Sequence, residues 1–256
     1  MIWALLCLLF FSTPPQQPAP AATASARVWE GRAAEYEAYL RTAPIVKMTA
    51  VDLGVTHPKR AFFAPDGLAA SAAWKPLRPG FQNGYWESYK SEIAAYHLDR
   101  LLELRMVPPA VEREVRGDMG AAIMWIDGSR SVKEEGGQVP SSVVWGPAVR
   151  RMVMFDNLIG NPDRNAGNIL LGPPGEFILI DHSRAFVTDR DLKKFDRVDA
   201  DLWDRITRVP ADDLRRVLQP WVDGPAIAAV LARRDQMIAT VDRLVKSRGR
   251  TAVIIP

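Results

Sequence analysis

The sequence predicts an α+β fold in two lobes, with strands dominating the first lobe, helices dominating the second and a cleft between them. Short strand patterns separated by turn signals fill most of the chain before residue 127, and helical patterns fill most of it after residue 143. The turn signal Asp127-Gly128 lies between the two parts, and no composition shift marks a linker there. We therefore expect the two lobes to form one cooperative unit.

The first lobe is predicted over residues 27–127. Apolar residues at helical spacing alternate there with short β-type runs, and Ala64-Pro65-Asp66-Gly67 gives a hairpin whose second strand ends at Lys75. The strongest helix carries a continuous apolar stripe and ends at Pro108-Pro109. In chain order the expected elements are a helix over 27–44, strands over 45–55, 60–63 and 68–75, a loop from 79, a helix over 88–104, and strands over 111–115 and 121–126.

The second lobe is predicted over residues 128–256. It opens on a polar, glycine-rich segment that we expect to be a mobile connector, and Gly172-Pro173-Pro174-Gly175 predicts a second hairpin. In chain order the expected elements are the connector 133–138, a helix over 143–159, strands over 169–171 and 177–180, and helices over 189–246 that break at Pro210, Pro220 and Gly224.

Residues 1–26 carry the pattern of a secretory signal peptide. Residues 2–11 form an apolar run that is too short to span a bilayer, and Ala24-Ser25-Ala26 is a candidate cleavage site. We expect an exported protein, periplasmic or secreted, with no transmembrane span in the mature chain. Without cleavage, the segment would anchor the protein to a membrane by its N-terminus. The single cysteine, Cys7, lies in this segment, so the mature chain would hold neither a disulfide nor a thiolate metal site.

The bulk composition is that of an ordinary globular protein, with 48% hydrophobic and 25% charged residues. The net charge of +3 gives no reason to expect a nucleic-acid partner. The only histidines are His57, His97 and His182, so a zinc site is not expected either.

The most informative stretch runs from Phe155 to Asn168 and reads FDNLIGNPDRNAGN. Pro162 restricts the residue before it to extended conformations, so the preceding helix ends there and Asp163 lies in a loop. Asn168 follows five positions later, and Asp181 ends an apolar strand further on. Protein kinases use this spacing in the loop H-R-D-x-x-x-x-N and the later metal-binding Asp. The spacing predicts Asp163 as the catalytic base, and Asn168 and Asp181 as ligands of Mg²⁺ or Mn²⁺.

Two upstream residues complete the predicted site. Lys75 ends an apolar strand, and Glu92 lies seventeen positions later near the start of the strongest helix, where its neighbours pack. A buried carboxylate requires a partner. In kinases a helix Glu pairs with the strand Lys that reaches the nucleotide phosphates. Taken singly, Lys75 would be an ordinary strand-end lysine and Glu92 an acid at a helix start. Their order along the chain favours ATP-binding roles.

The sequence holds neither G-x-G-x-x-G nor a Walker A motif. A cover for the phosphates could instead come from Thr56, Lys59 and backbone amides.

Four motifs together resemble the atypical kinases with a split protein-kinase-like fold. NPDRNAGNILL and LIDHSRAF are similar to HipA-like and phosphatidylinositol 3/4-kinase-like catalytic loops, and to the secretory-pathway family of Golgi casein kinase and four-jointed kinases. The last resemblance is the strongest. It includes AAWKP and SEIAAYHLDRLLELRMVPPAVER, and it covers residues 72–186.

This resemblance implies an ATP- and metal-dependent phosphotransferase with an alcohol group as acceptor, acting outside the cytosol. It implies that Lys75 binds nucleotide phosphate, Glu92 supports Lys75 or the metal, Asp163 is the base and Asp181 binds metal. The chain departs from the family in having DHS in place of D-F-G or D-N-G and no cysteine pairs. Its acceptor, a protein, sugar or lipid hydroxyl, is not carried over. A nucleotide-binding pseudokinase and an AMP-transferring kinase-like protein remain alternatives.

Overall fold

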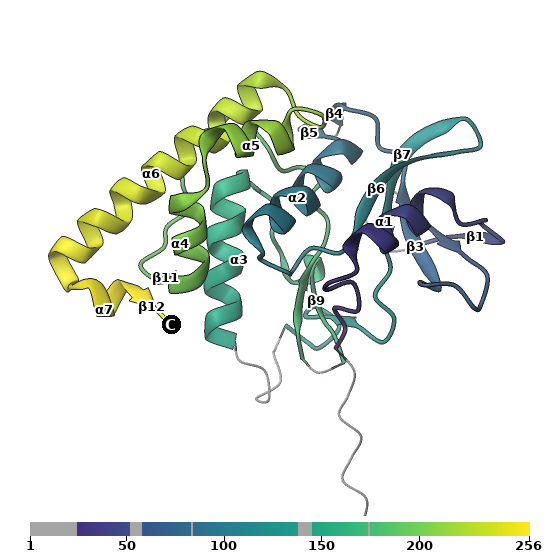
Figure 1. Cartoon of the computed structure of the whole chain (residues 1–256), viewed down its shortest axis with the longest axis horizontal. Coiled ribbons are helices and arrows are strands. Elements are labelled where there is room, and N and C mark those ends of the chain that lie inside the picture. Colours follow the sequence, from purple (N-terminus) through teal and green to yellow (C-terminus); the bar gives the residue numbers. More distant parts are fainter. Residues whose placement is uncertain (1–24, 52–57, 83, 138–144, 174) are drawn as a thin grey trace, which may run out of the picture.

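A computed structural model of the chain describes residues 25–51, 58–82, 84–137, 145–173 and 175–256 (Figure 1). The predicted α+β class is confirmed, since a five-stranded antiparallel sheet is combined with a helical part. The lobe boundary at residues 127–128 stays a prediction. The first half contains α1 (Ala33–Thr42), β1 (Lys47–Ala50), β2 (Lys59–Phe62), β3 (Ser71–Lys75), β4 (Gly80–Gln82), β5 (Tyr85–Glu87), α2 (Tyr89–Leu102), β6 (Ala110–Val115) and β7 (Asp118–Met124). The second half contains β8 (Arg130–Ser131), α3 (Trp145–Ile159), the 3-10 helix η1 (Ala166–Asn168), β9 (Ile169–Leu171), β10 (Phe177–Leu179), β11 (Val198–Asp199), α4 (Ala200–Arg208), α5 (Ala211–Leu218), α6 (Gly224–Arg248), α7 (Arg250–Val253) and β12 (Ile254–Ile255).

The five-stranded sheet has the order β1-β2-β3-β7-β6, which places β3 at its centre. Successive strand residues face opposite sides of a sheet. On β7, Ala121 and Ile123 therefore join the core that surrounds α2, whereas Ala122 and Met124 join the core that surrounds α1. The sheet is thus buried on both faces around its middle strands, and Lys75 lies at the end of the central one.

The helical part is built around α3, which contacts α6 and β11. Figure 1 shows α6 as a long helix along the outer side of α4 and α3. A small sheet of order β10-β9-β8 lies between this part and the larger sheet, and its strand β9 is followed at once by β10 in a hairpin. Buried side chains form one continuous core from α2 through α3 to α6, and a separate core lies between α1 and the larger sheet. The single cooperative unit stays a prediction.

Three predicted elements need correction. The stretch after Pro79 was expected to be a loop, but it forms the β4–β5 hairpin, in which aromatic residues favour strand pairing. The helices predicted over 189–246 begin only at α4, because residues 189–197 are not helical and β11 comes directly before α4. The described part of the predicted connector 133–138 is a turn in which the Ser131 backbone N–H and hydroxyl donate to the Glu134 carboxylate, and residue 138 lies outside the described residues. Within the described part of the strand predicted over 45–55, only β1 is a strand, and residues 52–55 lie outside the described residues.

The predicted signal peptide lies outside the described residues except for its last two. Ser25 Oγ donates to the Glu176 carboxylate at 2.9 Å, and the Ala26 backbone N–H donates to the same group at 2.9 Å. None of the helices in the described ranges is both long and apolar enough to cross a membrane.

Candidate active site

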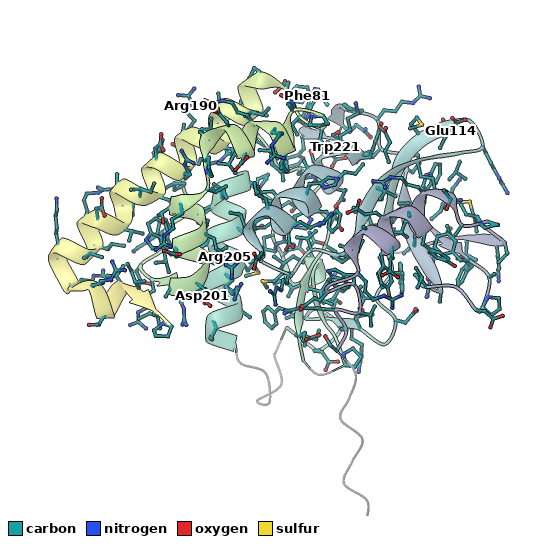
Figure 2. The ribbon with its side chains drawn as sticks, viewed as in Figure 1. Phe81, Glu114, Arg190, Asp201, Arg205 and Trp221 are labelled. Carbon is teal, nitrogen blue, oxygen red and sulfur yellow. The ribbon has the colours of Figure 1, made fainter. Side chains whose placement is uncertain are left out.

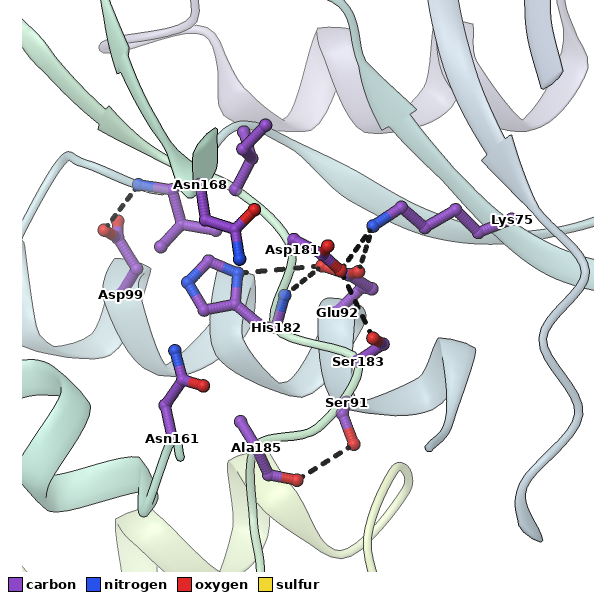
Figure 3. Close-up of polar contacts among 12 residues, drawn as sticks. Lys75, Ser91, Glu92, Asp99, Asn161, Asn168, Asp181, His182, Ser183 and Ala185 are labelled. Carbon is purple, nitrogen blue, oxygen red and sulfur yellow. Dashed lines mark hydrogen bonds and ion pairs between the residues drawn. The ribbon is translucent and has the colours of Figure 1, made fainter. Parts of the chain in front are cut away.

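Lys75 lies at the centre of a three-part ion cluster (Figure 3). It ends β3, and its side chain is on the α2 face of the sheet, opposite that of Trp74. Its Nζ donates to Glu92 Oε1 at 2.7 Å and to Asp181 Oδ1 at 2.9 Å. Only 9% of the Lys75 side chain is exposed. A strand, a helix and a segment more than a hundred residues away therefore meet at one ammonium group.

Glu92 is held in the first turn of α2. Ser88 caps this helix by accepting a hydrogen bond from the backbone N–H of Lys90, which fixes where the helix begins. The Glu92 side chain is 3% exposed and uses both oxygens, because Oε1 accepts from Lys75 and Oε2 accepts from the backbone N–H of His182 at 2.9 Å. Glu92 therefore positions both the lysine and the backbone directly after Asp181.

The cluster keeps Lys75 and Glu92 ionised. Burial alone would lower the pKa of Lys75, but the carboxylates of Asp181 and Glu92 outweigh it and raise that pKa above its ordinary value. Burial would likewise raise the pKa of Glu92, but the Lys75 ammonium and contacts from His182 hold it well below the usual range. Lys75 is therefore a permanent cation, which is the state that phosphate binding requires.

The β9–β10 hairpin brings Asn168 and Asp181 close together. Ile169 pairs with Leu179, so the residues just outside this pair are neighbours, and the Ile180 backbone N–H donates to the Asn168 carbonyl at 3.1 Å. Asp181 has a positive φ of 58°, a conformation that Asp tolerates better than most side chains. Its side chain is 29% exposed. Across the described residues, no hydrogen bond uses the Asn168 Oδ1 atom, so it can serve as a ligand oxygen.

Asp163 lies in the loop after α3, as predicted, because the helix ends at Ile159. The Asp163 backbone N–H donates to the buried Asn161 Oδ1 at 3.1 Å, and its carbonyl accepts from Asn168 Nδ2 at 3.1 Å. The second bond fixes the amide of Asn168 so that the nitrogen faces the loop. The Asp163 carboxylate, 38% exposed, accepts from Arg184 Nη1 at 3.1 Å.

Arg164 anchors the same loop to α3 and to the β9–β10 hairpin. Its side chain is 6% exposed and pairs with Asp156, with Nε to Oδ2 at 2.9 Å. Its Nη1 donates to the carbonyls of Asn168 and Ile180 at 2.7 and 2.8 Å, and its Nη2 lies 2.9 Å from His182 Nε2. Arginine can only donate, so His182 Nε2 accepts and Nδ1 carries the proton. One guanidinium therefore joins the ends of β9 and β10 to α3.

The five predicted site residues form two connected groups. Lys75 contacts both Glu92 and Asp181, and the Asn168 side-chain Nδ2 donates to the backbone carbonyl of Asp163. Across the described ranges, no hydrogen bond or ion pair joins the Asp163 carboxylate to the side chain of Asn168 or Asp181. The two groups are linked instead through Arg164 and the β9–β10 hairpin.

The donor set fits a divalent cation shared with phosphates. Within the part of the chain that the structure describes, no three His, Cys, Asp or Glu residues gather as a complete metal cage. Mg²⁺ sites in phosphotransfer enzymes need only one or two carboxylates, because phosphate oxygens and water supply the rest. Asp181 and the Asn168 Oδ1 atom provide such a partial set.

Sequence reasoning missed Arg184, which links two acids. Its Nε donates to the buried Glu87 at 2.6 Å, its Nη1 donates to Asp163, and its guanidinium lies 4.2 Å from the Tyr85 ring centroid. No spacing rule signals this residue, because β5 and the segment after β10 meet only in the folded chain. The contacts that Arg164 makes with Asp156 and His182 also went unpredicted.

The suggested phosphate cover is not supported. Lys59 lies directly across from Trp74 in the β2–β3 register, so its side chain is on the face opposite Lys75. Its Nζ lies 5.8 Å from the Trp74 ring centroid. Thr56 lies outside the described residues.

Comparison with solved structures confirms the fold suggested by the motifs. The crystal structure of the Golgi casein kinase matches with a TM-score of 0.67 and 19% identity over 88% of this chain and 80% of that one. The structure of hydra Fam20 with sugar matches with a TM-score of 0.65 and 17% identity over 85% and 90%. The Golgi casein kinase with Mn/ADP bound matches with a TM-score of 0.66 and 18% identity over 88% and 79%. No family model matches the sequence, and neither does any curated protein. The chain therefore has the two-lobed atypical kinase-like fold.

Proposed function

We propose that this protein is an ATP- and metal-dependent kinase that transfers the γ-phosphate to a hydroxyl group of a protein, sugar or lipid. The observation that carries the proposal is the contact of Lys75 with both Glu92 and Asp181, at 2.7 and 2.9 Å. A buried ion cluster of this kind is not needed for stability alone, because apolar groups of similar volume do as well. The kinase-like fold supports a phosphotransferase role for the cluster.

Lys75 would hold the α- and β-phosphates of ATP. Its ammonium is fixed at the end of β3 by Glu92, so no reorganisation is needed to aim it. Its second partner, Asp181, is more exposed than Glu92, at 29% against 3% for the side chains. Lys75 can therefore exchange its bond to Asp181 for phosphate oxygens while Glu92 continues to hold it.

Asn168 and Asp181 would hold the divalent cation, Mg²⁺ or Mn²⁺. When bound, such a cation neutralises the charge of the transferred phosphate. Asn168 offers its Oδ1 atom because Nδ2 is committed to the Asp163 carbonyl. The Mn/ADP-bound Golgi casein kinase supports a nucleotide with a divalent cation in this fold.

Asp163 would orient the acceptor hydroxyl and take its proton. The loop backbone is fixed by Asn161 and Asn168, which limits the positions its carboxylate can reach. Arg184 engages one carboxylate oxygen, Oδ2, and leaves Oδ1 for the hydroxyl. Tyr85 of β5 lies beside Arg184, and the same hairpin exposes Phe81 and Trp86 (Figure 2), so the acceptor would enter from that side.

The test is phosphate transfer from γ-labelled ATP, with Mg²⁺ or Mn²⁺, to three acceptor panels: a protein mixture, oligosaccharides and glycerolipid vesicles. We expect transfer to one panel, and a loss of at least about 100-fold in Asp181→Asn. The matched control is Asp201→Asn, an exposed aspartate in the first turn of α4, which should keep full activity. Equal transfer by wild type and Asp181→Asn would refute the proposal.

The same experiment separates the alternatives. A pseudokinase would bind ATP, seen as a rise in melting temperature, without forming any product. An AMP-transferring enzyme would release pyrophosphate and leave an adenylyl group on its product, which mass spectrometry distinguishes from a phosphoryl group. The retained Lys75, Asp163 and Asp181 favour phosphate transfer over the first alternative.

Export is a further part of the proposal, since the predicted signal lies outside the described residues. Fractionation of a C-terminally tagged chain should place it outside the cytosol, and the mass of the purified protein should lack the first residues. An intact, cytosolic chain would contradict export without affecting the kinase proposal.

A further inference from the structure

A small cavity lies on the face of the five-stranded sheet that points away from Lys75. Its volume is about 240 Å³. Trp74 forms part of its lining, together with Met48 and Lys59 from β1 and β2 and Val115 and Arg116 from the β6–β7 hairpin. Because Trp74 and Lys75 are consecutive on β3, they face opposite sides. The cavity is therefore separate from the candidate active site.

The cavity carries positive charge that the described residues do not neutralise. The side chains of Lys59 and Arg116 are both exposed, and neither makes a hydrogen bond or ion pair with any described residue. The one acid at the rim, Asp118, already accepts from Arg78 Nη2 at 3.2 Å. Among the described residues, two cations without an ion-pair partner thus line the cavity, while the Asp118 carboxylate is paired with Arg78 outside it.

Trp74, which lines the cavity, carries a hydrogen-bond donor without an acceptor. The residue is 3% exposed, and its buried indole Nε1 has no partner among the described residues. A buried N–H that is left unpaired costs about 1–3 kcal/mol, and such groups are rare in folded proteins. The Lys59 Nζ atom lies 5.8 Å from the centroid of the Trp74 ring, so a shift of this exposed side chain would uncover part of the indole. An acceptor atom that reached Nε1 would satisfy it.

The remaining lining is apolar. Met48 and Val115 pack with Trp74 in a small cluster, and Val115 is 8% exposed. Ligand pockets for drug-sized molecules usually measure about 300–1,000 Å³, so this cavity suits a smaller molecule than a nucleotide. Donors and cations select a negative group, and the indole face and aliphatic side chains select an apolar body.

We infer that this cavity is a second binding site, which takes a small organic anion: a carboxylate or phosphate monoester on a compact apolar body. Lys59 and Arg116 bind the anionic group, and the Trp74 indole N–H donates to it. The inference does not depend on the proposed kinase activity, because no residue of the candidate active site takes part.

Calorimetric titration with benzoate and with phenyl phosphate tests the inference, with benzyl alcohol as the neutral control. We expect saturable binding of at least one anion at one site, and at least about tenfold weaker binding of benzyl alcohol, because charge-assisted hydrogen bonds are the strong ones. Which anion binds more tightly separates a carboxylate site from a phosphate site. Asp181→Asn should bind as wild type does, so a failed kinase test leaves this result standing.

Variants connect the binding to the cavity. Lys59→Ala/Arg116→Ala removes two exposed side chains and should lower affinity by at least about tenfold. Trp74→Phe keeps the apolar body and loses the N–H, so affinity should fall several-fold, and its melting curve shows whether it is folded. Lys47→Ala, an exposed lysine on the same strand β1 as Met48, is the matched control and should bind normally. Absence of saturable binding, or unchanged affinity in the double variant, would overturn the inference.

Discussion

Replacement of Arg164 by methionine should be one of the most damaging single changes in the chain. The Arg164 and Asp156 side chains are only 6% and 5% exposed, so the variant leaves a buried carboxylate without its cation. Of its former partners, Asp156 keeps one bond from Asn161 Nδ2, and the Ile180 carbonyl loses its guanidinium donor. Breaking a buried ion pair from one side costs about 3–5 kcal/mol. We expect a loss of that size in the free energy of unfolding.

Urea unfolding followed by far-ultraviolet circular dichroism measures this loss. At the slopes usual for small proteins, the midpoint should fall by roughly 1–2 M. Arg164→Lys keeps the charge but cannot contact four partners at once, so it should lie between the wild type and Arg164→Met. Arg208→Met is the control: the Arg208 side chain is 79% exposed and, among the described residues, pairs only with Asp204, so the loss of stability should stay within about 0.5 kcal/mol.

The same unfolding assay also tests the cause of the lost stability. If the damage comes from an unpaired buried charge, neutralising Asp156 in the Arg164→Met background should restore part of the stability. The Asp156→Asn/Arg164→Met double variant should therefore be more stable than Arg164→Met alone. A double variant that is less stable, or an Arg164→Met cost below about 1 kcal/mol, would refute the account of this ion pair.

Three further predictions follow from single contacts. Arg184→Gln frees the Asp163 carboxylate and should lower kcat for phosphate transfer more than it raises KM for ATP; a change confined to KM would contradict this. Gly160 has a φ of 60°, and a Cβ at this position would lie 2.6 Å from the Arg233 guanidinium carbon. Gly160→Ala should therefore lower the free energy of unfolding by more than about 1 kcal/mol. Gly224→Ala, with open space around its Cβ at the start of α6, should be neutral, and thermal unfolding compares the two. Burial raises the pKa of Asp99 to about 6, against three backbone N–H donors that lower it. Between pH 4 and pH 6 the native state then binds more protons than the unfolded state, so this group's contribution to stability falls by up to about 3 kcal/mol as pH rises. The Asp99→Asn variant should lose this part of the pH dependence, which urea midpoints measured from pH 4 to pH 6 would show. A midpoint profile identical to that of the wild type would count against the raised pKa.

The sequence predicted those parts of the fold that local patterns encode. The helix that became α2, the end of α3 before Pro162 and the β9–β10 hairpin all carry strong periodicity or turn signals. The β4–β5 hairpin was missed because its strands have three residues each, too few for an alternating pattern to show. Short pairings of this kind depend on their neighbours more than on their own composition.

The sequence predicts which residues form the candidate site, but it does not predict most of the hydrogen bonds and ion pairs that join them. Lys75 and Glu92 could be paired in advance, because a buried glutamate on a packed helix needs a cation. The part played by Arg184 could not be foreseen, since the segments that carry it and Glu87 lie far apart in sequence. The side to which Lys59 points was also unpredictable, because a strand's register decides it and a shift of one residue reverses it.

The network behind the site suggests why these residues depend on one another. Lys75 contacts Glu92, Glu92 accepts from the backbone of His182, and the His182 ring accepts from Arg164, which pairs with Asp156 on α3. Each link is buried, where polar contacts strengthen one another and an unpaired member is costly. One continuous series of polar contacts therefore joins the lysine on the sheet to the loop after α3. Changes at Glu92 and at Arg164 should then be non-additive in stability, by 0.5 kcal/mol or more as is usual for groups in one network. Additive losses would mean that the two halves of the site are positioned independently.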